Sequence, residues 1–364
     1  MIFVSKLALI HDWLNQMGGA EDVLETLVGM FPAAPIYTSI YAPRLMPPAY
    51  QQWPIRVSFM NRLPGIHRHH QPYLPLYPLA FERFDFTSYD VLLSNKSGFC
   101  HGVRPPAGAT HICYCLTPTR YVWNFEDYAG REGLGRAARL ALRPLLVWLR
   151  QWDKAAAGRV HHFIAISSAV QKRIRQFYNR ESVIIYPPVN IDRFTPRAEV
   201  GDYFLSLGRL IPYKRVDLAV RACTELNLPL WVAGAGRDRE RLERLAGPTV
   251  KFLGRAPDED VPQLMARARG FIFPGLEDFG IAPVQALAAG RPVIAFAGGG
   301  ALDTVQDGVN GVLFHEQSVE ALKAALTRFA EIKFDPASIR ASAERFAARH
   351  FTEQLSSFIG SLGH

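Results

Sequence analysis

A carboxylate and a glycine-flanked helix start lie close together in the stretch from Phe271 to Gly300. The first residues form an apolar run that predicts a buried strand of a parallel sheet, and Glu277 and Asp278 follow it. Pro283 suits the first turn of the next helix, because the amide that proline lacks would have no partner there. Ligands of open α/β sheets bind beyond the carboxyl ends of the strands. Glu277 could therefore face a ligand, or it could be a solvated residue of an ordinary crossover loop.

The helix that follows this carboxylate is suited to binding an anion at its first turn. Gly280 lets a ligand approach the backbone, and the free amides around Ile281 and Ala282 suit a phosphate group. The helix of small residues is expected to stop at Gly290, and residues 291–296 predict the next buried strand. The unit is therefore strand, loop, helix and strand, with an acidic residue at the carboxyl end of the first strand.

A second glycine-containing turn lies near the start of the sequence. Residues 7–10 form a short apolar run, His11 and Asp12 follow, and Gly18 and Gly19 precede a predicted helix. A Gly-Gly pair between a strand and a helix can let a phosphate or a sugar approach the backbone. It can equally be a tight turn that binds nothing.

Alternating strands and helices predict an α/β fold with two domains. In the first half, buried strands are expected at residues 7–10, 89–94, 110–116, 162–167 and 183–186. In the second half, they are expected at residues 203–207, 230–232, 250–253, 271–273 and 293–296. Pro187 and Pro188 are the best candidate for the boundary between the domains. The last two predicted helices, about 336–350 and 352–362, have no strand between them, so we expect them to pack back across the first domain.

The predicted helical region from Gly133 to Ala157 is basic, with arginines interspersed among leucines. It could lie on a membrane surface, or it could pack on the core with a solvated basic side. Its apolar run is too short to span a bilayer, and the start of the chain predicts a first strand rather than a signal peptide. We expect a cytoplasmic protein without a transmembrane helix, able to contact the inner face of the plasma membrane through the basic residues of 136–152.

Composition indicates a globular protein with anionic partners. A length of 364 residues suits two domains with cores of their own, and 49% hydrophobic with 20% charged residues is typical of globular chains. The formal net charge of +8 favours nucleotide sugars, anionic lipids or nucleic acids as partners. The basic residues are spread along the chain without a DNA- or RNA-binding motif, so we expect no nucleic-acid partner. Cys113 and Cys115 do not have the spacing of a zinc knuckle, which favours a reduced protein.

A histidine cluster is the remaining candidate for a metal site. His67, His69 and His70 lie in the segment 32–78, which is rich in Pro, Tyr and His. No acidic or cysteine residue is spaced to complete a site with them. An irregular, partly exposed loop whose aromatic residues could help to hold an acceptor is the favoured interpretation, and we expect no bound metal.

Several short motifs occur in order along nearly the whole chain: Gly18-Gly19-Ala20-Glu21, Tyr186-Pro187-Pro188-Val189, Gly208-Arg209-Leu210 with Lys214, Gly234 with Gly236, residues 271–300 and residues 308–314. Together they resemble the retaining, nucleotide-sugar-dependent glycosyltransferases of family 4, which have the GT-B architecture. Residues 114–123 and 152–167 resemble, within that family, bacterial GDP-mannose-dependent mannosyltransferases of surface-polysaccharide assembly.

This resemblance implies two Rossmann-like, doubly wound domains that face a cleft, with C-terminal helices that cross back to the first domain. The implied ranges are 1–187 for an acceptor-side domain, 188–345 for a nucleotide-sugar-binding domain and 346–364 for a C-terminal helix on the first domain. Family members of this kind generally work without a bound metal, and no other cofactor is implied.

The resemblance also implies the roles of individual residues. Negative charge grows on the diphosphate as the glycosidic bond breaks, and Arg209 and Lys214 match the cations that stabilise it. Glu277 matches the first of two glutamates separated by seven residues, and in the family it lies beside the transferred sugar. Base recognition relies on backbone groups, here around residues 254–256. The implied substrate-binding residues are Gly18, Gly19, Thr117, Arg120, Gly208, Gly254, Arg255, Phe279, Gly280, Ile281, Ala282 and Gln285.

The chain departs from the family pattern at two positions. Gln285 stands where the family has its second glutamate, which holds the ribose hydroxyls, so weaker nucleotide binding is expected. Leu116 stands where many relatives have a histidine near the transferred sugar. Leucine forms no hydrogen bond, so Thr117, Arg120 or another residue takes that role, or the chain is a slow or inactive relative. His11 and His101 are other candidates, although structural roles are more common for such histidines.

The activity implied is transfer of a hexose, best matched by mannose from GDP-mannose, to a lipid-linked oligosaccharide during bacterial polysaccharide or O-antigen synthesis. The alternatives are an inactive or weak GT-B protein that binds a nucleotide or partner, and a GT-B sugar-nucleotide epimerase.

Overall fold

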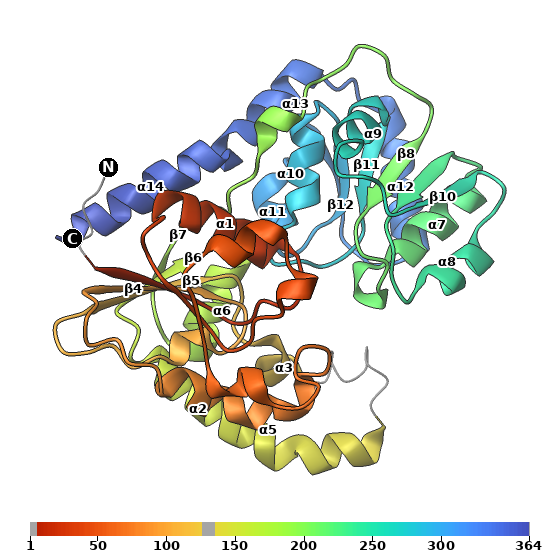
Figure 1. The fold of residues 1–364 in the computed structure, drawn as a ribbon. Coiled ribbons are helices and arrows are strands. Elements are labelled where there is room, and N and C mark those ends of the chain that lie inside the picture. The colour runs from red at the N-terminus through yellow and green to blue at the C-terminus, as the bar shows by residue number, and fades with distance from the viewer. Residues whose placement is uncertain (1–5, 126–134, 364) are drawn as a thin grey trace. The chain divides into compact units, whose positions relative to one another are not determined.

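The computed structural model describes residues 6–125 and 135–363, and the chain divides into two compact units (Figure 1). Unit 1 consists of Met1–Ile166, Val170–Tyr186 and Phe351–His364. Unit 2 consists of Ser167–Ala169 and Pro187–His350. The chain thus passes from unit 1 to unit 2 at the Pro187-Pro188 pair and returns after His350, beside the predicted range limits at 187 and 346.

Unit 1 is built on a parallel sheet with the strand order β3-β2-β1-β4-β5-β6-β7. Its strands are β1 Leu7–His11, β2 Ile36–Thr38, β3 Ile55–Val57, β4 Val91–Lys96, β5 Thr110–Cys115, β6 His162–Ala165 and β7 Ser182–Ile184. The described helices that pack with it are α1 Gly19–Met30, α2 Tyr77–Glu82, α3 Arg120–Trp123, α5 Arg136–Ala157, α6 Ser168–Tyr178 and α14 Ala348–Ser361. Every residue of β1 and β4 is buried, as expected for central strands covered on both faces.

Unit 2 is built on a second parallel sheet, with the strand order β10-β9-β8-β11-β12-β13. Its strands are β8 Phe204–Leu207, β9 Leu230–Ala233, β10 Val250–Gly254, β11 Gly270–Phe273, β12 Val293–Phe296 and β13 Gly311–Phe314. Its helices are α7 Val216–Glu225, α8 Arg239–Leu245, α9 Val261–Arg267, α10 Ile281–Ala288, α11 Ala301–Thr304, α12 Val319–Glu331 and α13 Pro336–Ala343. The chain forms β8 first and adds β9 and β10 on one side of it. It then adds β11, β12 and β13 on the other side. The carboxyl ends of β8 and β11 therefore form the switch point at which doubly wound sheets bind ligands.

Three short strands differ from the sequence predictions. The segment 32–78, expected to be irregular, contributes β2 and β3 to the sheet of unit 1, with Ile36 paired to Ile55. In unit 2, β13 follows β12 and was not predicted as a strand. Strands of three or four residues are too short to show a period. Most of the rest of segment 32–78 consists of turns and 3-10 helices.

The two C-terminal helices separate. The last helix, α14, packs in unit 1 as predicted: Phe351 lies 5.4 Å from Tyr114 and Phe358 lies 5.8 Å from His162, between ring centroids. The helix before it, α13, was also expected there but packs on α10 within unit 2, where Ile339 is fully buried. The reason is that the apolar residues of α13 complete the core of unit 2.

Within residues 6–125 and 135–363, no helix is both long enough and apolar enough to cross a bilayer.

Candidate functional site

The switch point of unit 2 brings a lysine and a carboxylate together. Lys214 ends a short 3-10 helix, Pro212–Lys214, in the loop after β8, and Glu277 lies in the loop after β11. The ammonium Nζ of Lys214 donates a hydrogen bond to Oε1 of Glu277. Their side chains are 20% and 17% exposed, so the ion pair is shielded but remains open to a ligand. Both residues were predicted to be catalytic, and the fold places them in contact.

Glycines allow the backbones of these two loops to meet. A Cβ on Gly275 would lie 2.9 Å from the carbonyl oxygen and 3.0 Å from the Cα of Lys214, closer than real Cβ atoms come to a backbone. The loop after β12 supports Glu277 from another side, because the amide of Gly300 donates to the carbonyl of Glu277 at 2.9 Å. The Pro274-Gly275 pair directly after β11 therefore lets the backbones that carry the two charged side chains approach each other.

The start of α10 lies next to Glu277 and presents an accessible side. Gly280 precedes it with φ of 92°, a left-handed conformation that favours glycine. The first amides of a helix have no acceptor within the helix, so those of Ile281 and Ala282 can bind an anion. Ile281, Ala282 and Gln285 are the partly exposed residues of α10. Among the described residues, nothing forms a hydrogen bond with the Gln285 side chain.

Two further predicted residues are placed differently. Phe279 is 4% exposed and packs against Phe346 at 5.6 Å between ring centroids, so its side chain belongs to the core and only its backbone faces the loop. Arg209 follows Gly208 at the end of β8 and is exposed. Its side chain forms no ion pair and no hydrogen bond with any residue in the described part of the chain.

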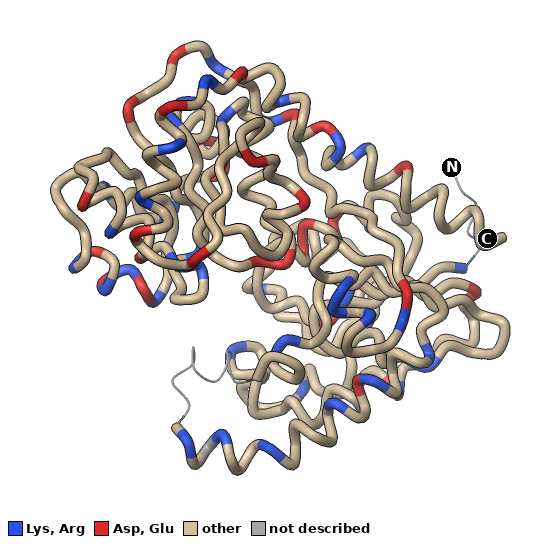
Figure 2. The backbone as a smooth tube through the Cα atoms, turned by 180° about the vertical axis from the view of Figure 1, so that it is seen from behind, with Lys and Arg blue, Asp and Glu red and all other residues tan. Residues whose placement is uncertain are grey.

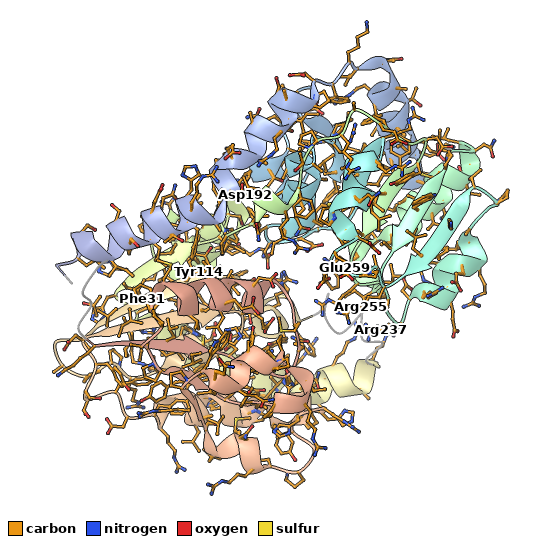
Figure 3. The ribbon with its side chains drawn as sticks, turned by 45° about the horizontal axis from the view of Figure 1, so that its top comes forward. Phe31, Tyr114, Asp192, Arg237, Arg255 and Glu259 are labelled. Carbon is orange, nitrogen blue, oxygen red and sulfur yellow. The ribbon has the colours of Figure 1, made fainter. Side chains whose placement is uncertain are left out.

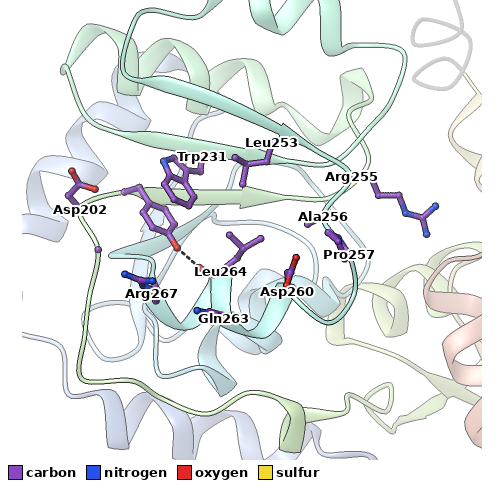
Figure 4. A pocket seen from close by; sticks show the side chains of 12 residues that line it. Asp202, Trp231, Leu253, Arg255, Ala256, Pro257, Asp260, Gln263, Leu264 and Arg267 are labelled. Atoms are coloured by element: carbon purple, nitrogen blue, oxygen red, sulfur yellow. Dashed lines mark hydrogen bonds between the residues drawn. The ribbon is translucent and has the colours of Figure 1, made fainter.

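A pocket of about 490 Å³ lies between α9 and the edge of the same sheet (Figure 4). Its lining includes Arg255, which follows Gly254 at the end of β10, and the stacked rings of Tyr203 and Trp231, 3.8 Å apart between centroids. Arg255 projects from the loop after β10, and Arg237 projects from the neighbouring loop after β9 (Figure 3). Arg255 and Ala256 of the predicted base-binding segment thus line a cavity, whereas Gly254 does not.

The switch point of unit 1 is closed by the chain itself. The carboxylate of Asp12, at the end of β1, accepts hydrogen bonds from four consecutive amides in the loop after β4. Those amides belong to residues 97–100, at donor–acceptor distances of 2.6 to 2.7 Å. Asp12 is 1% exposed. Backbone amides that could have held a phosphate are therefore occupied by an internal carboxylate.

The Gly-Gly turn of unit 1 also disfavours a phosphate. Gly18 precedes α1, and a Cβ on it would lie 3.4 Å from Oε2 of Glu21 in the first turn of that helix. Glu21 is 3% exposed, and its Oε1 lies 3.3 Å from Nε2 of His11. The acidic side chain already complements the positive end of the helix dipole. Gly18 and Gly19 are thus better placed for a neutral sugar than for a second anion.

The loop after β5, which carries Leu116 and Thr117 and leads into Arg120 of α3, is held by a buried lysine that the sequence analysis missed. Lys96 is fully buried, and its Nζ donates to the carbonyl of Thr117 and to Oγ1 of Thr119, both at 3.2 Å. Burial, the largest single influence, lowers the pKa of Lys96, but Asp153, Cys115, Cys113 and Asp12 together outweigh it and hold that pKa above its ordinary value.

The Asp153 carboxylate ties this loop to the helices of unit 1. It is fully buried and accepts hydrogen bonds from Trp123 Nε1 and from the Tyr178 hydroxyl, each at 2.7 Å. Oγ1 of Thr119 lies 2.8 Å from it. A lysine at the end of an apolar strand was the available signal. Leu116 is 8% exposed in this loop, and its amide donates to the carbonyl of Lys96, so it packs as core.

The candidate histidines have structural partners. His101 is fully buried against Asp153, and burial and Lys96 hold its pKa well below the ordinary value, so it stays neutral. Nε2 of His67 lies 3.0 Å from Oδ1 of Asn61, and Nδ1 of His70 lies 2.9 Å from the Tyr77 hydroxyl. In the described ranges, no three His, Cys, Asp or Glu side chains group as metal ligands would.

Two family descriptions match consecutive parts of the chain. "Glycosyltransferase Family 4" matches residues 17–193, and "Glycosyl transferases group 1" matches residues 190–346.

Curated relatives match over part of their length. The chain is 32% identical over 195 residues, 45% of this chain and 50% of the relative, to a GDP-mannose-dependent phosphatidylinositol monomannoside mannosyltransferase of Mycolicibacterium smegmatis. It is 26% identical over 165 residues, 41% of this chain and 45% of the relative, to the O-antigen chain mannosyltransferase RfbU of Salmonella typhimurium. The chain thus matches about half the length of these relatives.

Solved structures match over almost the whole chain. Anabaena HepE, in a complex with UDP and glucose, has a TM-score of 0.70 at 19% identity and covers 98% of this chain and 99% of its own. The lipopolysaccharide outer core galactosyltransferase WaaB has a TM-score of 0.69 at 18% identity, with coverage of 98% and 99%. At these identities the likeness is one of fold.

Proposed function

This chain belongs to family 4 of the glycosyltransferases and has the GT-B fold, and we propose that it transfers a hexose from a nucleoside-diphosphate sugar to a saccharide acceptor with retention of configuration. The supporting observation is the contact of Lys214 with Glu277 at the switch point of unit 2. A cation and a carboxylate there match the two charges of the reaction, a departing diphosphate and a sugar carbon that becomes positive.

In the proposed reaction, the bond between the sugar C1 and the diphosphate oxygen breaks, and the acceptor hydroxyl oxygen forms the new bond on the same face. The proton of that hydroxyl passes to the departing phosphate oxygen, so the products are a glycoside and a nucleoside diphosphate. Lys214 and Arg209 stabilise the negative charge on the diphosphate, together with the first amides of α10. Glu277 binds the sugar hydroxyls and favours positive charge at C1. The proposal includes no cofactor and no metal ion.

The nucleoside is proposed to lie along the carboxyl ends of the neighbouring strands. Gln285 can hydrogen-bond the ribose hydroxyls, because its amide is partly exposed beside the start of α10. Gly208 and the backbone of residues 254–256 would hold the diphosphate and the base. The acceptor is assigned to unit 1, where Arg120 is partly exposed and the Gly18-Gly19 turn is exposed. Thr117 is a weaker candidate, because it is 5% exposed and its hydroxyl donates to the carbonyl of Pro118 at 3.1 Å.

For the donor we propose GDP-mannose, and for the acceptor a lipid-linked oligosaccharide of bacterial polysaccharide synthesis at the inner face of the plasma membrane. The support is that the Mycolicibacterium relative is named as GDP-mannose-dependent and RfbU as an O-antigen mannosyltransferase. HepE was solved with UDP and glucose, which makes UDP-glucose the alternative donor to test.

Calorimetric titration of the protein with GDP-mannose, GDP, UDP-glucose and UDP tests the proposal. Binding of GDP and GDP-mannose without binding of UDP is expected. Binding of UDP alone would be consistent with hexosyl transfer but would make a UDP sugar, rather than GDP-mannose, the proposed donor. Absence of binding by all four would contradict the proposal and favour an inactive GT-B protein. Incubation with the bound nucleotide sugar alone, followed by analysis for an epimer, separates a transferase from an epimerase.

A further inference from the structure

The outward face of α5 carries large apolar side chains that the described chain leaves uncovered. Leu140, Val147 and Trp148 are 63%, 51% and 44% exposed. Pro144 is exposed between them. Exposed apolar residues are usually scattered, whereas these recur at helical spacing along one helix.

These residues are not needed to hold α5 in place. Leu146 and Leu149, on the opposite face, are 8% and 1% exposed and pack into unit 1. From Arg136 to Pro144, none of the side chains that the structure describes is buried. The exposed apolar residues therefore add nothing to the core and face the surroundings of unit 1.

A basic flank runs beside the apolar residues. Arg136, Arg143 and Lys154 are exposed, and none of them forms an ion pair with a residue in the described ranges. Successive residues of an α-helix are rotated by about 100° around its axis. These three cations therefore lie within roughly 20° of one another around the axis of α5, on one side of Val147. Leu140, Pro144 and Trp148 lie on its other side. Figure 2 shows basic residues recurring along this helix.

Acidic side chains do not offset this charge on α5. The acidic residue of the helix, Asp153, is fully buried and bonded to Trp123 and Tyr178. The exposed face thus combines a row of cations with a row of apolar side chains that includes a tryptophan. That combination is typical of helices that lie in the interface of a membrane.

We propose that this surface, the α5 face, docks on an anionic lipid bilayer with the helix parallel to the membrane plane. The α5 face consists of Arg136, Leu140, Arg143, Pro144, Val147, Trp148 and Lys154. The apolar row enters the boundary between headgroups and acyl chains, and the long cationic side chains reach the phosphates. A second copy of this chain is a poorer occupant, because a symmetric contact would bring the cationic rows together.

This inference rests on exposure and charge and not on the transfer reaction. It is compatible with a lipid-linked acceptor, which would be delivered at the same membrane. The test measures membrane binding without donor or acceptor, so its result is independent of the proposed function.

The first experiment is flotation of the full chain with phosphatidylcholine vesicles that contain or lack about one third phosphatidylglycerol, in roughly 0.1 M NaCl. Binding to the anionic vesicles is expected, and binding should weaken with salt. The variant Leu140→Gln/Val147→Gln/Trp148→Gln removes the apolar row, so its affinity for the anionic vesicles should fall by at least about tenfold. Its matched control is Leu45→Gln/Leu302→Gln/Val309→Gln, at positions 50%, 53% and 57% exposed, which should bind like wild type.

The basic flank is tested with Arg136→Gln/Arg143→Gln/Lys154→Gln. Each cation near an anionic surface contributes roughly fivefold to binding, so the triple variant should bind about a hundredfold more weakly. The control Arg221→Gln/Arg244→Gln/Lys251→Gln removes the same charge from exposed positions of unit 2 and should have little effect.

A spectroscopic readout reports insertion directly. Vesicles with brominated acyl chains should quench the fluorescence of Trp148, and Trp148→Phe should retain binding but lose that quenching. Failure of the wild type to bind anionic vesicles, or equal loss of binding in a control variant, would overturn the proposal. So would an apolar-row variant that changes only the self-association of the chain in sedimentation velocity.

Discussion

The ammonium of Lys214 and the carboxylate of Glu277 touch although the residues are 63 positions apart in the sequence. They meet because β8 and β11 are neighbours in the sheet while the two strands that lie between them in sequence are on the other side of β8. Neither partner is fully exposed, so the pair sits in a partly desolvated site where charge stabilisation is stronger than in water.

Replacing Lys214 by Ala is expected to lower hexosyl transfer by about a hundredfold or more, as for loss of one group that stabilises developing charge. The measurement is kcat/KM for the nucleotide-sugar donor. Circular dichroism confirms that the variant is folded. Lys323→Ala is the control, because Lys323 pairs with Glu225 and Glu320 on the surface. Near-normal turnover in Lys214→Ala would remove Lys214 from the proposed site.

A side chain at position 275 should separate the charged pair without touching it. In Gly275→Val, the new Cβ would meet the backbone of Lys214 at about 3 Å, so the loop must move. Transfer should fall at least tenfold, because small displacements in an active site have effects of this order. Gly360→Ala is the control, since a Cβ there meets nothing within 4 Å. Equal activity of both variants would show that the loop spacing does not matter.

Gln285→Glu should strengthen nucleotide binding. A carboxylate would accept charge-assisted hydrogen bonds from ribose hydroxyls, and the gain of about 1 kcal/mol corresponds to roughly fivefold in Kd. Calorimetry with the nucleotide identified for the wild type provides the measurement. Gln306→Glu introduces the same charge at an exposed position of unit 2 and should leave Kd unchanged. A weaker Kd in Gln285→Glu would place the ribose elsewhere.

Lys96→Met should destabilise unit 1 by about 3 to 5 kcal/mol, because it leaves the buried Asp153 carboxylate without its counter-charge. Urea unfolding followed by tryptophan fluorescence measures this change. The double variant Lys96→Met/Asp153→Asn leaves no unpaired buried charge. Its loss in free energy of unfolding should therefore be smaller than the sum of the losses in the two single variants. Lys154→Met, an exposed neighbour, should stay within about 0.5 kcal/mol of wild type. Additive losses would show that the two side chains are not coupled.

Acid should destabilise unit 1 through His111. Burial, with the nearby His101 and His161, lowers the pKa of His111 to about 3. The unfolded chain, with a histidine pKa of about 6.5, binds a proton that the folded state excludes between these values. The contribution of His111 to the free energy of unfolding is therefore fully present above a pH of about 6.5 and falls as the pH decreases. At pH 5 the loss from this residue is about 2 kcal/mol. Urea unfolding of wild type and His111→Gln at pH 7 and pH 5 should show a smaller loss in the variant, and equal losses would contradict the assignment.

Local patterns gave much of the fold from the sequence. The apolar runs predicted β8 to β12 nearly at their observed bounds, because strands buried on both faces need continuous apolar residues. The Pro and Gly residues from Gly275 to Gly290 placed the loop and helix of the predicted site for a similarly local reason: each constrains its own backbone. β2 and β3 were missed because three-residue strands have no readable period.

Long-range pairings could not be read in the same way. Asp12 appeared in the sequence only as a polar residue after a strand, yet it closes the loop at residues 97–100. Lys96 lies two residues beyond the predicted strand 89–94 and was not singled out, yet it is fully buried near Asp153. Both results depend on which strands are neighbours, and composition and periodicity carry no information about strand order.

The sequence by itself therefore determined the two α/β halves, the boundary candidate at Pro187-Pro188 and the residue types at the strand ends, because these follow from interactions between near neighbours in the chain. The tertiary structure decided that Lys214 meets Glu277, that Phe279 turns into the core and that the apolar row of α5 stays exposed. Those outcomes depend on contacts between distant segments, in which the close approach of two backbones and the competition for burial select one arrangement.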